Sequence, residues 1–479
     1  MSEYLHRIDT EELPSQVVTP AEADAGLQVI FGLAPVNMVD DPAVNKPVIA
    51  YSYTEAVAAM GFCYDFGNYT ISQAIDANFN VFSNAPLVMV NVLDPKKHVK
   101  DLSVENVLVA SGVATVKEIG ILKAGLTVQN GNGGAELTAG TDYVLSFSAE
   151  GYLEIALTSS EITKVNVSGK QLDPNKVTKN DIIGGYNVST GESTGLEVLS
   201  QVYPRLGVVP GIVLAPHWSK DSEIAAVMAA KTKEINGIFE AMFVVDLDTS
   251  VYKTYTAAAG ARDEMGITSR DGVMVWLKQK LGTKVYDGSV IWAAATCATD
   301  SENEDIPKKS PSNIASNMSA AVLEDGTEVY LDNPQGAVLN AAGIVTFINS
   351  NGWKVWGNNT TAFPGTTAPE DRWISCRRMM NWYRAHFILT FGEKVDDPTN
   401  YRLVEAVVDT ENQYLNSLTT NGHIAGGKIT FRESDNPISQ ILDGQMVFYT
   451  TIAFWTPAEH ITNKIEFDPA LIQSALQQG

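Results

Sequence analysis

VVPGIVLA (residues 208–215) and AMFVVD (241–246) are two short, continuously apolar runs, and a segment with helical spacing, 222–235, lies between them. Runs of this length with Gly or Pro nearby are typical of buried strands. Because both strands are apolar on both faces, we expect them to pair in parallel within a sheet that is covered on both sides. The segment therefore predicts an α/β fold.

The pattern continues on both sides of this unit. Apolar spacing after it predicts a helix over residues 273–281 and a strand over 289–296, followed by a polar loop over 301–319. The other expected elements are strands at 25–32, 87–92, 427–431 and 445–454, and helices at 53–61, 71–79, 372–389 and 400–419.

A change of texture interrupts the α/β pattern. Residues 103–185 are rich in Gly, Thr, Ser and Val, and they hold short alternating stretches such as YVLSF (143–147) and YLEIAL (152–157). Short strands about ten residues apart, divided by turn residues, are typical of a small β-sandwich or barrel. We therefore expect residues 98–190 to form a β-rich domain inserted into the α/β frame.

The two ends of the chain carry too little apolar surface to pack alone. Residues 1–20 are acidic and contain Pro14 and Pro20, and residues 461–479 are semi-polar. We expect a multidomain α/β protein with mixed α+β parts. Its segments are an N-terminal arm (1–20), the first part of an α/β core (21–97), the inserted domain (98–190), an α/β domain (191–330), a C-terminal domain (331–460) and a C-terminal arm (461–479).

Composition argues against several classes of partner. The 479 residues hold 33 Lys and Arg against 56 Asp and Glu, which gives a formal net charge of −23. A field of this sign repels phosphate and disfavours a nucleic-acid or anionic-membrane binder. No apolar run approaches the ~18 residues that a membrane span needs. We expect no direct contact with nucleic acid and no membrane insertion.

Cysteine usage and the N-terminal sequence bear on the compartment. Only Cys63, Cys297 and Cys376 occur, with no short spacing between them. This scattered, odd-numbered set disfavours a disulfide scaffold or a CxxC metal site and indicates reduced thiols. The start MSEYLH lacks the basic and apolar regions of a signal peptide, so we expect a protein made in the cytosol.

One polar cluster allows an enzymatic interpretation. His217 follows the expected strand 208–215, Asp246 ends the expected strand 241–246, and Asp248 comes two residues later. All three lie at the carboxyl ends of parallel strands, where α/β enzymes place functional groups. These residues predict, as an alternative, a metal-dependent hydrolase. The motifs GxSxG, HExxH, GxxxxGK[ST] and CxxC are missing, and His386 and His423 fit structural roles. We expect a chain that is not an enzyme, with no catalytic residue, cofactor or metal.

A dense positive segment stands out in this acidic chain. RWISCRRMMNWYR (372–384) places four arginines in one expected helix, and Arg377, Arg378 and Arg384 share or border one helical face. Two interpretations stay open: the arginines pair with carboxylates of their own chain, or they meet an acidic partner protein. The overall charge disfavours a third, nucleic acid.

Short motifs at both ends of the chain occur in a specific order. LNAAGI (339–344), WKVWGNNT (353–360), WISCRR (373–378) and PAEHI (457–461) follow one another in the C-terminal part, and IFGLAP (30–35), YTEA (53–56) and MG (60–61) lie upstream. In this order they resemble segments of the contractile tail sheath proteins of phages and phage-tail-like particles. The chain departs from that pattern at Asn359, where the family usually has Arg, and in an N-terminal arm shortened to YLHRI (4–8).

The resemblance implies a structural subunit of a virion tail. It implies stacked hexameric rings that form around a tail tube in the bacterial host cytoplasm and contract to drive the tube through an envelope. The implied partners are other copies of the chain, the tube protein, and baseplate and tail terminator proteins. A tail tube subunit or another structural virion protein is a further alternative. The residues expected to face the tube are Arg377, Arg378 and Arg384, and those expected to add strands to neighbouring subunits are Tyr4, Leu5, Ile8, Ile461, Ile465 and Phe467.

Overall fold

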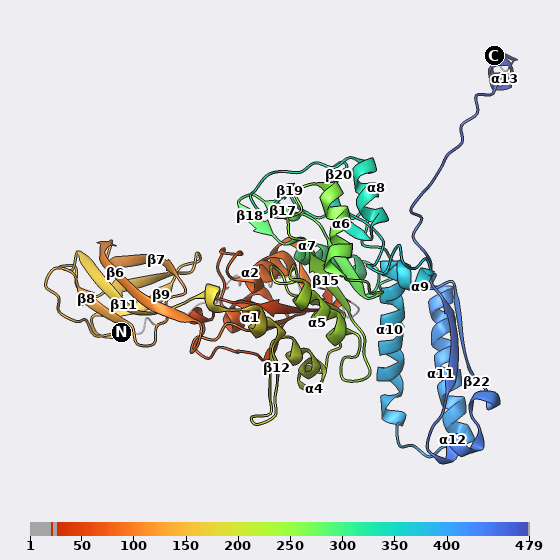
Figure 1. Ribbon diagram of the computed structural model, residues 1–479, viewed down its shortest axis with the longest axis horizontal. Helices are drawn as coiled ribbons and strands as arrows, with labels where there is room; N and C mark the ends of the chain where they lie inside the picture. Colours follow the sequence, from red (N-terminus) through yellow and green to blue (C-terminus); the bar gives the residue numbers. More distant parts are fainter. Residues whose placement is uncertain (1–20, 23–25, 478–479) are drawn as a thin grey trace, which may run out of the picture.

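The computed structural model describes residues 21–22 and 26–477 and places three parts in a row: an inserted β-domain, a central α/β body and a C-terminal helical unit (Figure 1). The body is built on an eight-stranded sheet with the order β21-β20-β16-β15-β14-β2-β5-β3. The inner six strands are parallel, and the two edge strands are antiparallel to their neighbours. The strands are β2 (Gln28–Gly32), β3 (Pro47–Ala50), β5 (Leu87–Asn91), β14 (Ile212–Leu214), β15 (Met242–Asp246), β16 (Gly272–Val275), β20 (Ile344–Asn349) and β21 (Trp353–Trp356).

Both faces of this sheet are covered. Every residue of β2, β5, β14, β15 and β16 is buried, as continuously apolar parallel strands require. The predicted α/β class and the parallel strand-helix-strand unit are confirmed. The helices of the body are α1 (Tyr53–Met60), α2 (Thr70–Ile75), the π-helix η3 (Asp76–Phe82), α4 (Val202–Leu206), α5 (Ser222–Thr232), α6 (Tyr255–Met265), α7 (Gly288–Ser301) and α8 (Asn333–Ala341).

Two predicted elements are wrong, and their assignments are interchanged. Residues 273–281 form β16 and then β17 (Lys278–Leu281) rather than a helix, and residues 289–296 lie inside α7 rather than in a strand. Twelve of the fourteen residues of α7 are buried. A helix that is enclosed on all sides has no polar face, so its sequence shows no amphipathic period and looks like a buried strand.

Two expected domain boundaries also need correction. Residues 331–356 contribute β20 and β21 to the central sheet and α8 beside it, so the body continues past the boundary expected at 330. The described residues of 21–97 thus form one body with residues 173–356, and the two stretches are not separate domains. The smaller antiparallel sheet at its margin consists of β17, β18 (Lys284–Tyr286) and β19 (Ala320–Val322), and a short parallel pair joins β1 (Ala21–Glu22) to β4 (Asn84–Ala85).

The inserted domain is a six-stranded sheet with a hydrophobic core of its own, which includes Val116, Leu153, Ile155 and Val165. It ends at Leu172, earlier than the expected boundary at 190, because the following residues pack into the core of the body. Those residues form α3 (Lys179–Ile183) and a projecting hairpin of β12 (Gly185–Asn187) and β13 (Glu192–Thr194). The strands of the inserted domain are β6 (Val99–Ala110), β7 (Val113–Ile119), β8 (Thr127–Asn130), β9 (Tyr143–Phe147), β10 (Tyr152–Leu157) and β11 (Lys164–Leu172).

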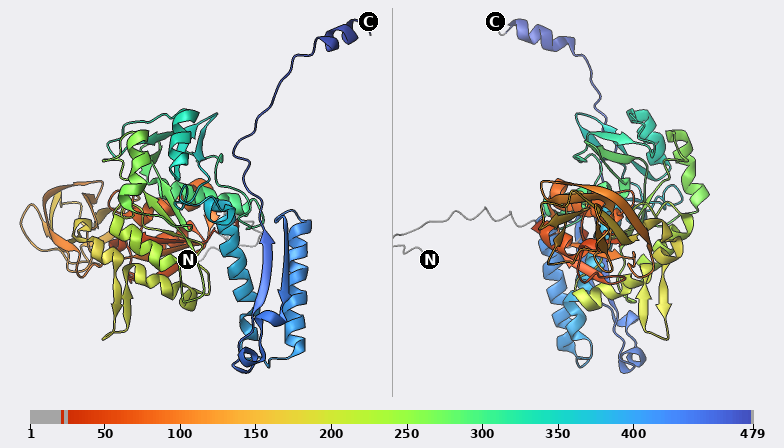
Figure 2. Two further views of the ribbon diagram at one scale, coloured as in Figure 1. Left: turned by 45° about the vertical axis from the view of Figure 1, so that its right-hand side comes forward. Right: turned by 90° about the vertical axis from the view of Figure 1, so that its left-hand side faces the viewer.

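The C-terminal helical unit has a third hydrophobic core, formed by residues such as Met379, Tyr383, Val407 and Leu415. Among the described residues, no helix is long and apolar enough to cross a membrane. Beyond the unit, the chain extends away from the body and ends in α13 (Pro469–Gln477) (Figure 2). The elements of the unit are α10 (Ile374–Phe391), α11 (Tyr401–Thr420), α12 (Ile438–Leu442) and the hairpin of β22 (Gly426–Phe431) and β23 (Phe448–Ala453), and the short helix α9 (Pro369–Arg372) precedes them.

Candidate functional site

The arginine-rich segment forms α10, the helix through which the C-terminal helical unit meets the body. Arg377 and Arg378 lie near its start and turn toward the body, with side chains 3% and 2% exposed. Arg384, two turns further on, is 42% exposed. The three arginines therefore occupy different environments, although their spacing in the sequence is short.

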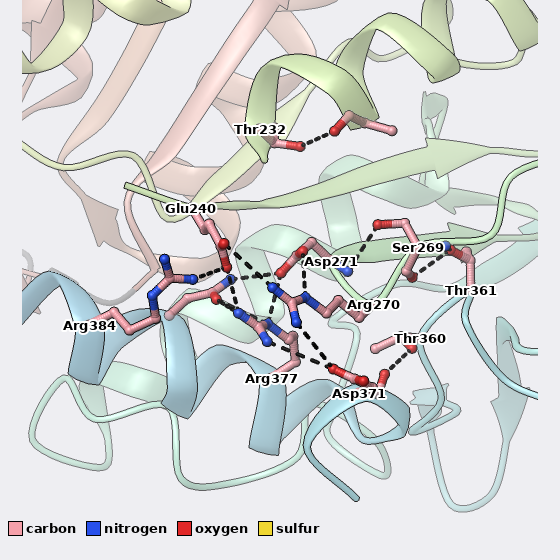
Figure 3. A network of polar contacts seen from close by, with 12 residues as sticks. Thr232, Glu240, Ser269, Arg270, Asp271, Thr360, Thr361, Asp371, Arg377 and Arg384 are labelled. Carbon is pink, nitrogen blue, oxygen red and sulfur yellow. Dashed lines mark hydrogen bonds and ion pairs between the residues drawn. The ribbon is translucent and has the colours of Figure 1, made fainter. Parts of the chain in front are cut away.

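A charge-neutral network surrounds Arg377, and we call it the arginine network (Figure 3). Its Nη2 lies 2.6 Å from Glu240 Oε2, and its Nε lies 2.9 Å from Asp271 Oδ1. Arg384 pairs with the same Glu240 carboxylate. Three arginines and three carboxylates balance in charge, which is what burial at such a site requires. The members are Arg270, Arg377, Arg384, Glu240, Asp271 and Asp371.

The network fastens α10 to one edge of the central sheet. Glu240 lies just before β15 and Asp271 just before β16, so both carboxylates stand at the amino ends of parallel strands. Asn381, one turn after Arg377 on α10, adds a hydrogen bond from its Nδ2 to Asp271 Oδ1 at 3.0 Å. The C-terminal helical unit is thus tied to the body by directional, charge-assisted bonds.

Arg378 makes a second connection between α10 and the body. Its guanidinium donates from Nη1 to Asp300 Oδ1 at 2.9 Å and from Nη2 to the other carboxylate oxygen, and Asp300 lies on α7 in the centre of the body. Burial raises the pKa of Asp300, and the charge of Arg378 opposes that rise. Removing one partner of such a buried pair destabilises the fold, because the charge that remains is neither paired nor solvated.

These positions correct the expectation that Arg377 and Arg378 face a tail tube. Both guanidinium groups are buried and already paired with carboxylates of their own chain. Of the two interpretations left open by the sequence, internal pairing is the one that the structure shows for them. Arg384 is the only one of the three whose side chain is substantially exposed.

The sequence did not point to Glu240, Asp271 or Asp300 as the partners. A usable signal was present for Glu240, which directly precedes the apolar run 241–246 that predicts a strand, but not for Asp271, because the run after it was predicted as a helix. What was missing was the position of α10 along the sheet, which depends on contacts between residues more than a hundred positions apart.

No family model matches the chain, but individual proteins do. The chain is 25% identical over 484 residues to the tail sheath protein of Burkholderia phage BcepMu, a similarity that covers 97% of this chain and 96% of the phage protein. The chain is thus a homologue of contractile phage tail sheath proteins. It is also 25% identical to the major tail sheath protein of Serratia phage KSP20, over 64% of this chain and 75% of that protein.

Solved structures show that the sheath fold extends over nearly the whole chain. A chain of the contracted helical sheath of the anti-feeding prophage is 16% identical, with a TM-score of 0.57, and the match covers 96% of this chain and 99% of that one. A chain of the sixfold-symmetrised baseplate of the same particle gives a TM-score of 0.59 at 15% identity, over 97% and 99% of the two chains. The role of a sheath subunit is structural.

In the described part of the chain, the alternative hydrolase site does not have the geometry of a metal centre. His217, Asp246 and Asp248 line one cavity of about 10 Å³, which is room for a single water molecule at most. Burial lowers the pKa of His217, and burial together with the charge of Asp287 raises the pKa of Asp246 to about 7. No group of three potential ligands that could hold a metal ion occurs in the described part of the chain.

Amines fill the space around these groups. Lys278 Nζ lies 3.2 Å from Asp287 and 2.9 Å from Glu324, and Lys220 Nζ lies 3.9 Å from Asp248. Two hydroxyls, those of Ser219 and Ser289, bond the Asp246 carboxyl. These residues therefore form a buried polar cluster with a structural role rather than an open site for a substrate.

The expected arm residues fall into two sets. Tyr4, Leu5 and Ile8 lie outside the described residues. Ile461, Ile465 and Phe467 belong to the C-terminal arm, whose described residues from 461 to 476 are all exposed.

The base of this arm is held by an ion pair. Glu459 Oε2 lies 3.3 Å from Arg372 Nη2, and the Arg372 guanidinium stacks over the rings of Phe363 and Trp373. Arg372 Nε also donates to Asn359 Oδ1 at 2.9 Å, so the residue at which the chain departs from the family pattern has a partner here. The arm thus leaves the body at a fixed point.

Proposed function

We propose that the chain polymerises as stacked hexameric rings around a tail tube, and that the polymer shortens to drive the tube through a bacterial envelope. The similar chains come from a baseplate with sixfold symmetry and from contracted sheaths, including that of an extracellular contractile injection system with a TM-score of 0.56. Assembly takes place in the cytoplasm of the host bacterium.

The observation that carries this proposal is an unpaired hairpin together with an exposed arm. Among the residues that the structure describes, β22 and β23 form a sheet of two strands, and a sheet of that size is marginally stable without further strands. In the C-terminal arm, Ile461, Ile465 and Phe467 lie at alternating positions and are exposed. Strand addition between copies accounts for both features. Backbone hydrogen bonds at the edge of the hairpin extend the sheet, and the alternate apolar side chains of the arm pack on one face of it.

A contracting lattice needs subunits that move as rigid bodies. The arginine network and the Arg378–Asp300 pair connect the C-terminal helical unit to the body at two points. An extended arm outside this rigid part keeps neighbours linked while the bodies rotate, as in other rigid-body transitions. The difference in free energy between the extended and the shortened polymer then resides in the contacts between copies of the chain.

The other partners follow from the same assembly. We propose contacts with the tail tube protein, with the baseplate and with a tail terminator, and no catalytic role, direct nucleic-acid contact or membrane insertion. For the tube contact, Arg384 and the exposed face of α11 are the remaining candidates. That face carries Arg402, Glu405 and Asp409, and solvated ion pairs there would be weak singly and strong in sum over many copies.

Electron microscopy of the purified chain tests the proposal. The unmodified chain is expected to form tubes, and the triple variant Ile461→Glu, Ile465→Glu, Phe467→Glu is expected to form none, because charged side chains cannot pack on the added face. The matched control is Thr462→Glu with Lys464→Glu, which places charge on the opposite face of the same strand and should still polymerise. Tubes from the triple variant, or no tubes from the unmodified chain at any concentration, would contradict the proposal.

A further inference from the structure

The C-terminal arm ends in a helix that the sequence specifies locally. Asp468 caps it, accepting a hydrogen bond from the backbone N–H of Ala470 at 2.9 Å, and Pro469 occupies the first helical position, where its fixed φ favours a helix start. Leu471, Ile472 and Leu476 fall on one side of α13 at helical spacing. α13 is therefore an amphipathic helix.

This helix has no partner among the described residues of its own chain. Leu471 and Leu476 are 68% and 79% exposed, and both views of the molecule show α13 held away from the body (Figure 2). A helix of nine residues is marginal in water by itself, since most helical stability in proteins comes from packing of the apolar face. α13 thus requires a surface on another molecule.

A groove of matching character lies between α10 and the body. Its volume is about 370 Å³, which falls within the ~300–1,000 Å³ range of pockets that bind ligands. It opens beside the C-terminal helical unit, at the amino edge of the central sheet where the arginine network also lies. Its apolar walls are formed by Val208, Pro210 and Met242 of the body, Trp382 and Leu389 of α10, and Tyr414 of α11.

We propose that α13 of one subunit occupies this groove on a neighbouring subunit. The inference rests on the proposed function, because the same arm first brings its strand, residues 461–467, to the neighbour. It goes beyond strand addition by assigning a second contact, between side chains, to the end of the arm. The apolar face of α13 on one subunit then fits a different surface, the groove, on the next subunit. Such head-to-tail contacts generate a polymer and not a closed pair.

Charge favours this occupant over a polar or charged one. α13 contains no charged residue, so its burial removes no charge from water. Of the charged groups that line the groove, Glu240 and Arg378 already have their partners in the arginine network and on α7. A neutral apolar helix can enter without breaking those pairs, whereas a charged segment would compete for them.

The position of the groove also suits the arm. α11 contributes Tyr414 to the groove wall, and through Asn412 it bonds the backbone of Ile429 in β22 at 3.0 Å. The groove and the hairpin thus lie on the two sides of one helix, about 10 Å apart, the diameter of a helix. An arm whose strand joins the hairpin needs only to pass α11 to place α13 in the groove of the same neighbour.

Cysteine cross-linking in the assembled polymer tests the assignment. The native thiols Cys63, Cys297 and Cys376 are buried, so cysteines introduced at Leu389 in the groove and Leu476 on α13 are the reactive ones. Under oxidation the full-length double variant Leu389→Cys with Leu476→Cys is expected to give a ladder of covalent oligomers. The matched control is Leu389→Cys with Gln473→Cys, which places the thiol on the polar side of α13 and should lose most of that ladder.

A second measurement removes dependence on cross-linking chemistry. Leu471→Glu with Leu476→Glu should raise the concentration needed for polymerisation about tenfold or more, because burying even one Leu is worth at least that factor. Gln473→Glu with Ser474→Glu adds the same charge on the polar side and should leave that concentration unchanged.

The outcomes separate this inference from the proposed function. If the unmodified chain forms no tubes, the proposed function fails. Suppose instead that tubes form but the thiol introduced at Leu389 cross-links to neither α13 position. Another segment then occupies the groove, and the inference is overturned. Cross-linking in a further variant, Leu389→Cys with Leu5→Cys, would overturn it in the same way. Normal polymerisation of the Leu471→Glu, Leu476→Glu variant would overturn it as well.

Discussion

The start of α10 and the C-terminal arm place their side chains in opposite ways. α10 buries the charged groups of Arg377 and Arg378, whereas the arm exposes the apolar side chains of Ile461, Ile465 and Phe467. Buried charge is tolerated only where it is paired, and exposed apolar surface on an extended segment is found where another molecule covers it. The first region therefore serves the stability of the single subunit, and the second serves contacts between subunits.

The largest effect on subunit stability is expected at Arg378. Arg378→Ala leaves Asp300 buried without a counter-charge and should lower the free energy of unfolding by about 3–5 kcal/mol. Urea denaturation followed by circular dichroism measures this. The double variant Arg378→Met with Asp300→Leu removes both charges and should recover much of the loss. A fall below about 1 kcal/mol for Arg378→Ala would mean that this pair does not support the subunit.

The arginine network allows a comparison within one helix. Arg377→Ala should lower the free energy of unfolding by about 2–4 kcal/mol, since it leaves Glu240 and Asp271 under-compensated in a buried site. Arg384→Ala removes a half-exposed partner of the same Glu240 and should cost about 0–1 kcal/mol. Equal losses for the two variants would show that burial does not distinguish them.

Asp246 gives a pH-dependent version of the same comparison. Its pKa is raised from 3.8 to about 7 by burial and then by the charge of Asp287, so the folded chain holds a proton there that the unfolded chain releases. The free energy of unfolding therefore falls as pH rises from about 4 to 7, because the proton that favours the folded state is lost over that range. Asp246→Asn, which resembles the protonated form, should come closest to the unmodified chain in thermal stability at about pH 4, near the start of this window, and exceed it most at about pH 8.5. An unchanged difference between the two pH values would contradict this.

The smallest effect on the subunit is expected from removal of the arm. Deletion of residues 461–479 removes side chains that are exposed in the described part of the arm, so the melting temperature of the unassembled subunit should stay within about 1 °C. Differential scanning calorimetry at a concentration below assembly measures it. A fall of several degrees would place the arm in the core of its own subunit and remove the contrast with α10.

The sequence by itself determined the elements whose signal is local. The apolar runs at 208–215 and 241–246 predicted buried parallel strands, and Gly-rich alternation predicted the inserted β-domain. Both signals, a continuous apolar run and alternation divided by turn residues, can be recognised within a few consecutive residues. The order of short motifs indicated the family. The C-terminal arm followed in the same way, because residues 461–479 carry too little apolar surface to pack alone.

Tertiary structure alone decided what depends on distant residues. The run 289–296 in α7 shows no amphipathic period because the helix is enclosed on all sides, and β16 joins the sheet although its spacing resembles a helix. Whether Arg377 and Arg378 faced a partner or their own chain depended on Asp271 and Asp300, 106 and 78 residues away. A charge at a given helical position has no fixed destination until packing brings a carboxylate to it, and that is a property of the fold and not of the segment.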